Sequence, residues 1–282
     1  MYIVLEFIKA VLYGIVEGVT EWLPVSSTGH LILLEELLPM NVSPEFWEMF
    51  LVVVQLGAIL AVVLLFWKDI FPFSFKKGTP FFKKDIWILW FKIILACLPG
   101  VVYAFAFDDL LGDRLYNAVV VAIMLIVVGV VFLIVETKHK DVKPKITTTA
   151  DITFLQAFLI GIFQLIAAAL PGTSRSGATI IGGLLIGLSR TAAASFTFFL
   201  AIPVMAGESL LKLLKFGFSF TGQELLILIT GTVVSFVVSV IVIRFLLDYI
   251  RRRDFKPFGW YRIILGLLVL AYFFMKNMII FG

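Results

Sequence analysis

An arginine stands inside a polar stretch that interrupts an almost unbroken apolar background. The stretch 171–179 reads PGTSRSGAT, with Arg175 at its centre. A guanidinium offers a planar fork of donors that matches phosphate geometry, and it stays charged in apolar surroundings. Because such a charge is costly at membrane depth, we expect it to have a function. The alternative is a serine-capped helix start whose arginine reaches toward lipid headgroups.

Hydroxyl side chains flank this arginine. They are Ser174, Ser176 and Thr179. Ser176 and Thr179 are three residues apart and would share one face of a helix. A helix beginning near Ser176 would also direct free backbone amides and its positive dipole end toward an anion. We therefore expect Ser174, Ser176 and Thr179 to bind the oxygens of a phosphorylated substrate.

A second polar stretch, 17–30, supplies two carboxylates. Glu17 and Glu21 are four residues apart, so both project from one face of a helix. Paired anionic groups suit a hard divalent cation that also bridges phosphate oxygens. The alternative is an amphipathic helix face at a water interface.

The same stretch continues with a histidine among hydroxyls. Ser27 and His30 are three residues apart and share a face if this piece is helical. The imidazole could act as a base toward the serine, as a nucleophile on phosphorus, or as an acid to a leaving group. The alternative is a hydrogen-bonded structural histidine. Ser26 and Thr28 flank Ser27 and are predicted to bind substrate.

The composition predicts that a membrane protein positions these residues. Of 282 residues, 61% are hydrophobic and 15% charged, whereas soluble domains are about a quarter charged. A spanning helix needs about 20 mainly apolar residues, and six segments qualify. These predicted spans are 47–67, 87–107, 115–135, 193–213, 223–247 and 260–281.

The two polar stretches lie in segments that do not qualify as simple spans. Segments 3–39 and 152–188 each contain a helix-length piece, a break, and an apolar piece too short to cross. We interpret both as re-entrant hairpins, which are tolerated at membrane depth only where protein or water surrounds them. The predicted fold class is an all-α polytopic membrane protein with one integral membrane domain, 1–282.

An internal repeat appears when the chain is aligned with itself at an offset of 147 residues. The matches with most weight are Gly14 with Gly161, Pro24 with Pro171 and Ser27 with Ser174, while Glu17 falls on Gln164. Each half, 1–147 and 148–282, would hold one hairpin and three spans. Because three is odd, the second half must be inverted relative to the first. Inverted repeats bring two broken helices together near the membrane midplane, so we hypothesise that the polar stretches form one site for a lipid-linked diphosphate.

The loop charges predict the orientation. Basic residues cluster in 68–84, 138–145 and 251–256, which should therefore be cytoplasmic. The net-negative loop 108–114 should face outside, and so should both chain ends. The net charge of +4 is thus interpreted as a topology signal and not as a sign of nucleic-acid binding.

Three motifs together resemble a known family. The runs EGVTE at 17–21, PVSSTGH at 24–30 and PGTSRSGAT at 171–179 are similar to the signature motifs of bacterial undecaprenyl-diphosphatase, also called the bacitracin-resistance protein. The resemblance covers essentially the full length. It implies hydrolysis of undecaprenyl diphosphate to undecaprenyl phosphate and inorganic phosphate, which recycles a lipid carrier for cell-wall synthesis. It also implies a magnesium or calcium ion and a plasma-membrane location with the site opening to the outer, periplasmic side.

The family roles carry over to Glu17, Glu21, Ser27, His30, Ser174, Arg175, Ser176 and Thr179. With the neighbouring Ser26 and Thr28 added, the predicted site is catalytic Ser27, His30, Glu21 and Arg175, substrate-binding Ser26, Thr28, Ser174, Ser176 and Thr179, and metal ligands Glu17 and Glu21. Whether Ser27 or His30 is the nucleophile stays open. Other hypotheses are a transporter or flippase of undecaprenyl phosphate and a non-catalytic membrane scaffold. A homodimer is the one protein partner considered, and no nucleic acid is expected.

Overall fold

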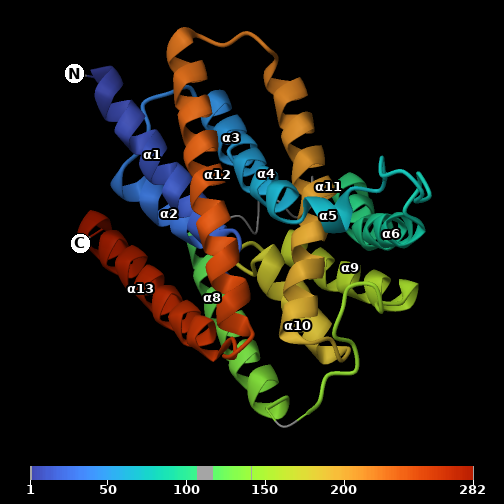
Figure 1. Cartoon of the computed structure of the whole chain (residues 1–282). Coiled ribbons are helices and arrows are strands. Elements are labelled where there is room, and N and C mark those ends of the chain that lie inside the picture. The colour runs from blue at the N-terminus through green and yellow to red at the C-terminus, as the bar shows by residue number, and fades with distance from the viewer. Residues whose placement is uncertain (1, 107–116, 141, 282) are drawn as a thin grey trace.

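The structure is a computed structural model that describes residues 2–106, 117–140 and 142–281. Within these ranges the regular elements are helices, accompanied by two isolated β-bridges. Figure 1 shows the helices gathered into one bundle, with the two hairpin bends near its middle. The predicted all-α class is confirmed.

The helices follow one another in a similar order in the two halves. Those of the first half are α1 Tyr2–Thr20, α2 Ser27–Leu37, α3 Pro44–Val53, α4 Gln55–Leu65, α5 Trp67–Ile70, α6 Lys84–Ala106 and α8 Ala118–Lys138. Those of the second half are α9 Phe154–Ala169, α10 Arg175–Leu185, α11 Arg190–Phe216, α12 Gly222–Ile250 and α13 Lys256–Phe281.

Six helical segments of the described residues are long and apolar enough to cross a membrane. They are Pro44–Leu65, Lys84–Ala104, Ala118–Lys138, Arg190–Phe216, Gly222–Ile250 and Lys256–Lys276. Each overlaps one of the six predicted spans, so each prediction falls on a helix of suitable length and composition. The first consists of two helices, α3 and α4, joined at Val54. The loop 108–114, predicted to face outside, lies outside the described residues.

Both polar stretches lie at the break between a longer and a shorter helix. Helix α2 folds back against α1, and α10 folds back against α9. The shorter helices have 11 residues each, or about 16 Å, roughly half of a hydrocarbon core. Neither can cross a membrane alone. The helix–break–helix pattern is confirmed, while the depth of the hairpins in a membrane stays a prediction.

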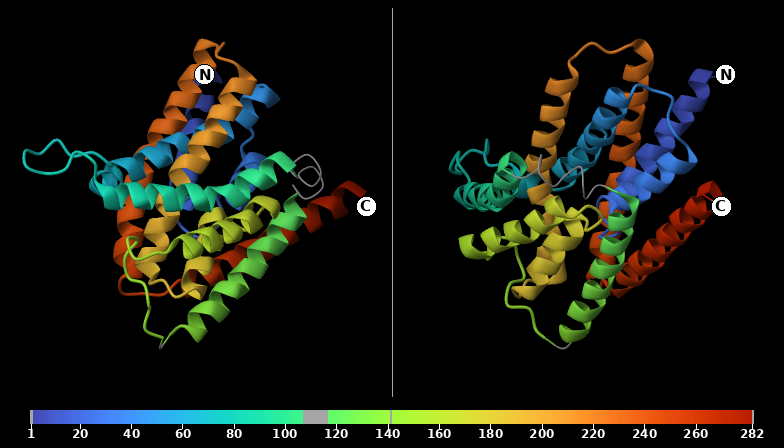
Figure 2. Two further views of the ribbon diagram at one scale, coloured as in Figure 1. Left: turned by 90° about the vertical axis from the view of Figure 1, so that its right-hand side faces the viewer. Right: turned by 180° about the vertical axis from the view of Figure 1, so that it is seen from behind.

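Each hairpin packs against a spanning helix from the opposite half of the chain. Helix α1 lies along α12, and α9 lies along α6. A Cβ added at Gly14 would lie 2.6 Å from the carbonyl oxygen of Gly231, and one at Gly161 would lie 2.4 Å from that of Ala96. Both glycines are therefore needed for the close approach of two backbones. Helices α8 and α13 form a third, antiparallel pair (Figure 2).

The two bends share an unusual backbone conformation. Ser26 and Ser174 have φ of 72° and 70° and are the non-glycine residues with positive φ in the described part of the chain. Each hydroxyl accepts a hydrogen bond from the amide three residues later, Gly29 for Ser26 and Gly177 for Ser174. The two short helices therefore begin with the same cap.

This cap corrects the alignment of the repeat. The constant offset pairs Ser27 with Ser174, but the structural counterpart of Ser174 is Ser26. The reason is that two residues separate Pro171 from its capping serine, whereas one residue separates Pro24 from Ser26. The alignment is therefore wrong by one residue after the bend.

Helix α10 lies in the interior of the molecule. Its residues from Ser176 to Leu184 are all buried. A Cβ at Gly182 would lie 2.5 Å from the Phe163 ring, so only glycine admits this neighbour. The arginine at the start of α10 is thus attached to a closely packed helix.

Candidate active site

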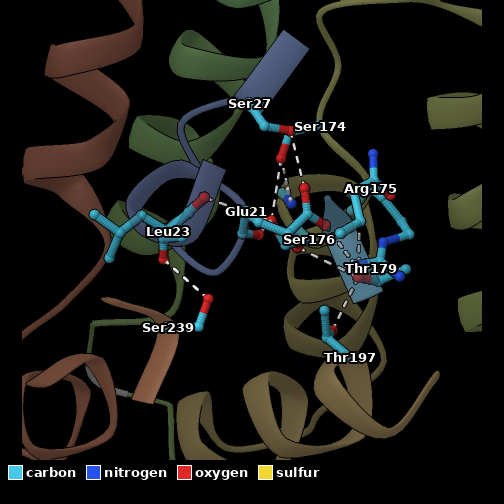
Figure 3. A network of polar contacts seen from close by, with 12 residues as sticks. Glu21, Leu23, Ser27, Ser174, Arg175, Ser176, Thr179, Thr197 and Ser239 are labelled. Atoms are coloured by element: carbon cyan, nitrogen blue, oxygen red, sulfur yellow. Dashed lines mark hydrogen bonds and ion pairs between the residues drawn. The ribbon is translucent and has the colours of Figure 1, made fainter. Parts of the chain in front are cut away.

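An ion pair joins the two bends. Arg175 Nη2 lies 2.5 Å from Glu21 Oε1, and the two side chains are only 15% and 9% exposed. Figure 3 shows Glu21 and Ser27 facing Ser174, Arg175 and Ser176 across the bends. The two polar stretches therefore meet in space, as the repeat hypothesis requires.

Glu21 is the centre of this polar network. Its other oxygen, Oε2, accepts a hydrogen bond of 2.9 Å from the Ser27 hydroxyl. Its backbone carbonyl accepts one of 3.1 Å from the Ser176 hydroxyl. Glu21 thus holds a serine hydroxyl from the first bend and a guanidinium and a serine from the second (Figure 3).

The N-terminal ends of two helices converge on this network. Ser27 is the first residue of α2 and Arg175 the first residue of α10, and both contact the Glu21 carboxylate. The Ser174 and Ser176 hydroxyls lie 3.1 Å apart beside them. Unpaired amides and dipoles of helix N-termini favour an anion, and Arg175 adds a full positive charge. The arrangement can bind phosphate oxygens.

Arg175 and Glu17 retain atoms without partners. Arg175 Nη1 and both carboxylate oxygens of Glu17 are buried and make no hydrogen bond. Glu17 interacts electrostatically with Glu21 and Arg175, so these orphaned atoms belong to one neighbourhood. Buried polar atoms without partners are costly and are rare in folded proteins. Here they indicate where ligand atoms of opposite charge would be stabilised.

Thr179 and Thr28 occupy different surroundings. The Thr179 hydroxyl is buried, donates to the Arg175 carbonyl at 2.9 Å and accepts from Thr197 at 2.9 Å. It therefore holds the first turn of α10, and a substrate would have to displace these bonds to reach it. Thr28 is half-buried in the first turn of α2.

His30 points toward α13. Its Nδ1 lies 2.7 Å from the Ser26 carbonyl oxygen, and its Nε2 lies 2.6 Å from the Tyr261 hydroxyl. The Ser27 hydroxyl is bonded to Glu21, so Ser27 and His30 share a helix but have different partners. The sequence pattern predicted the shared helix and missed Tyr261.

Arg262 is a second residue that sequence reasoning missed. It is completely buried on α13, and Nη1 donates to the Pro24 carbonyl at 3.2 Å. Nη2 donates to the carbonyls of Gly172 and Thr173 at 2.7 and 2.9 Å. One guanidinium thus ties both bends together. The sequence did contain a signal for Arg262, since it lies inside the apolar span 260–281. Charged residues in such segments are rare and are usually paired or functional.

The donors that could hold a metal ion are few. No group of three or more His, Cys, Asp or Glu side chains suited to a metal occurs among the described residues. Glu17 and Glu21 supply carboxylates, and magnesium or calcium commonly completes its shell with water and phosphate oxygens. The orphaned carboxylate of Glu17 fits a cation that is shared with a bound phosphorylated substrate.

Comparison with known proteins gives consistent matches over nearly the whole chain. Residues 10–268 match the family model described as bacitracin resistance protein BacA. The chain is 58% identical to the undecaprenyl-diphosphatase of Desulfitobacterium hafniense over 274 residues, covering 97% of this chain and 98% of that protein. It is 56% identical to that of Enterococcus faecalis over 267 residues (94% and 96%). It is 55% identical to that of Lachnoclostridium phytofermentans over 273 residues (97% and 99%).

Proposed function

The chain belongs to the bacitracin resistance protein BacA family, and we propose that it hydrolyses undecaprenyl diphosphate to undecaprenyl phosphate and inorganic phosphate. This reaction would recycle the lipid carrier for cell-wall synthesis and confer resistance to bacitracin. The name shared by relatives that are 55–58% identical supports the assignment. The structural observation that carries it is the Glu21–Arg175 contact, which assembles a buried anion site from two distant stretches.

The proposed architecture is an inverted-topology repeat of 1–147 and 148–282, with a re-entrant hairpin and three spans in each half. Support comes from the identical caps at Ser26 and Ser174 and from the packing of each hairpin against a span of the other half. We place this multi-pass protein in the bacterial plasma membrane, with the site opening to the periplasmic side. The contacts that define the proposed site are made within one chain, and a homodimer stays a proposal.

The diphosphate would bind between the starts of α2 and α10. Arg175 Nη1 would donate to a phosphate oxygen, and Ser174 and Ser176 would add neutral donors. Ser26 and Thr28 would contribute from the first turn of α2. Glu17, with Glu21, would hold a magnesium or calcium ion. A bound cation of this kind withdraws charge from phosphate oxygens and so stabilises the charge that develops on them.

We assign the attack on phosphorus to Ser27. Its hydroxyl donates to Glu21 Oε2, so the carboxylate can accept the proton as Ser27 Oγ bonds to the terminal phosphorus. The bond from this phosphorus to the bridging oxygen breaks, and undecaprenyl phosphate leaves. In the second step the oxygen of a water bonds to the phosphorus while His30 takes up a proton of that water, and the bond from phosphorus to Ser27 Oγ breaks. Glu21 returns its proton to Ser27 Oγ, and inorganic phosphate leaves. The direct attack by His30 is the alternative.

An apolar groove offers a place for the lipid chain. It has a volume of about 320 Å³ and runs between α2 and α13, with Leu33, Leu37, Leu265 and Leu268 in its wall. Leu33 lies one helical turn after His30, so the groove begins close to the site. Apolar chains are stabilised in such a groove in proportion to the area they bury.

The test is phosphate release by the purified protein in detergent micelles. We expect wild-type protein to hydrolyse undecaprenyl diphosphate and Glu21→Gln to lose roughly 10³-fold in kcat, because one substitution removes the proton acceptor and the Arg175 contact. Glu48→Gln is the matched control, since Glu48 is exposed and pairs with Lys212 at the surface. Lipid transfer across vesicles without phosphate release would favour the flippase, and an active Glu21→Gln would refute the proposed roles of Glu21.

A further inference from the structure

The hydrogen bonds of His30 define which ring nitrogen can exchange a proton. A backbone carbonyl only accepts, so the contact with the Ser26 oxygen at 2.7 Å requires a proton on Nδ1. In the neutral ring Nε2 therefore carries the lone pair, and it accepts from the Tyr261 hydroxyl at 2.6 Å. The exchangeable position of His30 is Nε2.

The contact at Nε2 places the two rings side by side. They are parallel within 4°, and their centroids lie 5.6 Å apart. His30 is thus held at Nδ1 by its own helix and at Nε2 by the Tyr261 hydroxyl on α13. The imidazole has one tautomer that satisfies both contacts.

A hydroxyl is suited to a partner that changes its protonation state. The Tyr261 hydroxyl can donate to a neutral Nε2 and can accept from a protonated one. Rotation of a single hydrogen keeps the bond in both states. An amide or ammonium donor at this position would stabilise the neutral ring alone.

Arg262 fixes the tyrosine relative to the bends. It follows Tyr261 on α13 and bonds to carbonyls of both bends. Helix α13 also packs closely on α8, since a Cβ at Gly259 would lie 2.9 Å from the Gly129 carbonyl oxygen. Tyr261 is therefore attached to the same rigid unit as the two bends, although its side chain is 45% exposed.

We propose that Tyr261 positions His30 for the hydrolysis and connects it to the attacking water: the Tyr261 hydroxyl takes a proton from that water as it passes its own proton to Nε2 of His30. The inference rests on the proposed function and adds a residue from outside the two polar stretches. It requires that Tyr261 acts through His30 and not through substrate binding. The competing role is an aromatic anchor that packs at the membrane boundary, for which the hydroxyl would be dispensable.

The test is Tyr261→Phe, which keeps the aromatic ring and removes only the hydroxyl. We expect kcat for phosphate release to fall about 10- to 100-fold with KM unchanged, because acid–base catalysis is worth about 10²–10⁴-fold and only the connection through Tyr261 is lost. His30→Ala should lose more. The double variant should be no slower than His30→Ala alone, because residues that act as a unit are not additive.

Tyr249→Phe on α12 is the control for the same substitution away from the site, and it should retain wild-type kcat. Thermal unfolding of each variant in the same detergent reports folding. Wild-type kcat in Tyr261→Phe would overturn the inference, and so would a multiplicative loss in the double variant or a change in KM alone. Absence of hydrolysis by the wild-type protein would overturn the proposed function and this inference with it.

Discussion

The two bends have the same backbone geometry and opposite charges. Both begin their short helix with a positive-φ serine that caps the glycine three residues later. The first bend brings the carboxylates of Glu17 and Glu21, whereas the second brings the guanidinium of Arg175. The shared geometry builds two helix starts that face each other, and under the proposed function the unequal side chains would divide cation binding and anion binding between them.

Glu17 and Gln164, which occupy the same position before the two bends, also differ in charge. Both side chains are buried and retain oxygens without a hydrogen-bond partner. A neutral amide tolerates this environment at lower cost than a carboxylate does. A charged Glu17 would therefore be the more costly side chain, and the proposed cation would offset that cost. Gln164, at the same position before the second bend, carries no charge to offset.

Removal of the positive charge of Arg175 from the second bend should have the largest effect. Arg175→Ala is expected to lower kcat for phosphate release by about 10³- to 10⁵-fold, the range associated with a transition-state arginine. Arg175→Lys should recover only part of this, because an ammonium lacks the planar fork. Arg251→Ala, at an exposed arginine that pairs with Asp248, should be unaffected. Near wild-type turnover by folded Arg175→Ala would remove Arg175 from the mechanism.

Making the first bend resemble the second should have the next largest effect. Glu17→Gln introduces the side chain found at 164 and removes the charge. We expect kcat to fall about 10²-fold and the response to added magnesium or calcium to be lost, because the carboxylate that would hold the cation is gone. Metal titration of phosphate release, with Glu48→Gln alongside, measures both. An unchanged metal response would assign the cation to other residues.

The smallest effects are expected from the shared caps. Ser26→Ala and Ser174→Ala should each destabilise the fold by about 1 kcal/mol, because the cap is lost while the positive φ remains. Glycine at either position should destabilise the fold by only a few tenths of a kcal/mol, since it adopts positive φ freely. Thermal unfolding in detergent would show the order Ser, Gly, Ala at both bends. A different order at the two bends would contradict their structural equivalence.

Segment lengths and apolar composition predicted most of the fold. The length of each uninterrupted apolar run predicted the six long helices, and the two runs interrupted by polar residues predicted the helix–break–helix segments. This works because a lipid environment leaves helices as nearly the only way to pair backbone groups. Spacing on one helix likewise placed Ser27 and His30 together on α2.

Contacts between distant helices could not be predicted in the same way. The bond from Ser27 to Glu21 and that from His30 to Tyr261 depend on the angle at which α2 leaves the bend and on the position of α13. Arg262 reaches carbonyls of both bends, although no motif links it to them. The one-residue shift between the bends became visible only through the caps of Ser26 and Ser174.

The amino-acid sequence by itself determined that this chain is a helical membrane protein with two polar bends of opposite charge and a family signature. Periodicity and apolar length are local properties, so they can be read along the chain. Only the tertiary structure decided which atoms of those bends meet, which remain without partners, and which residues of α13 hold them. These outcomes depend on the packing of helices that are far apart in sequence, and a one-residue shift or a small change in helix angle would alter every contact.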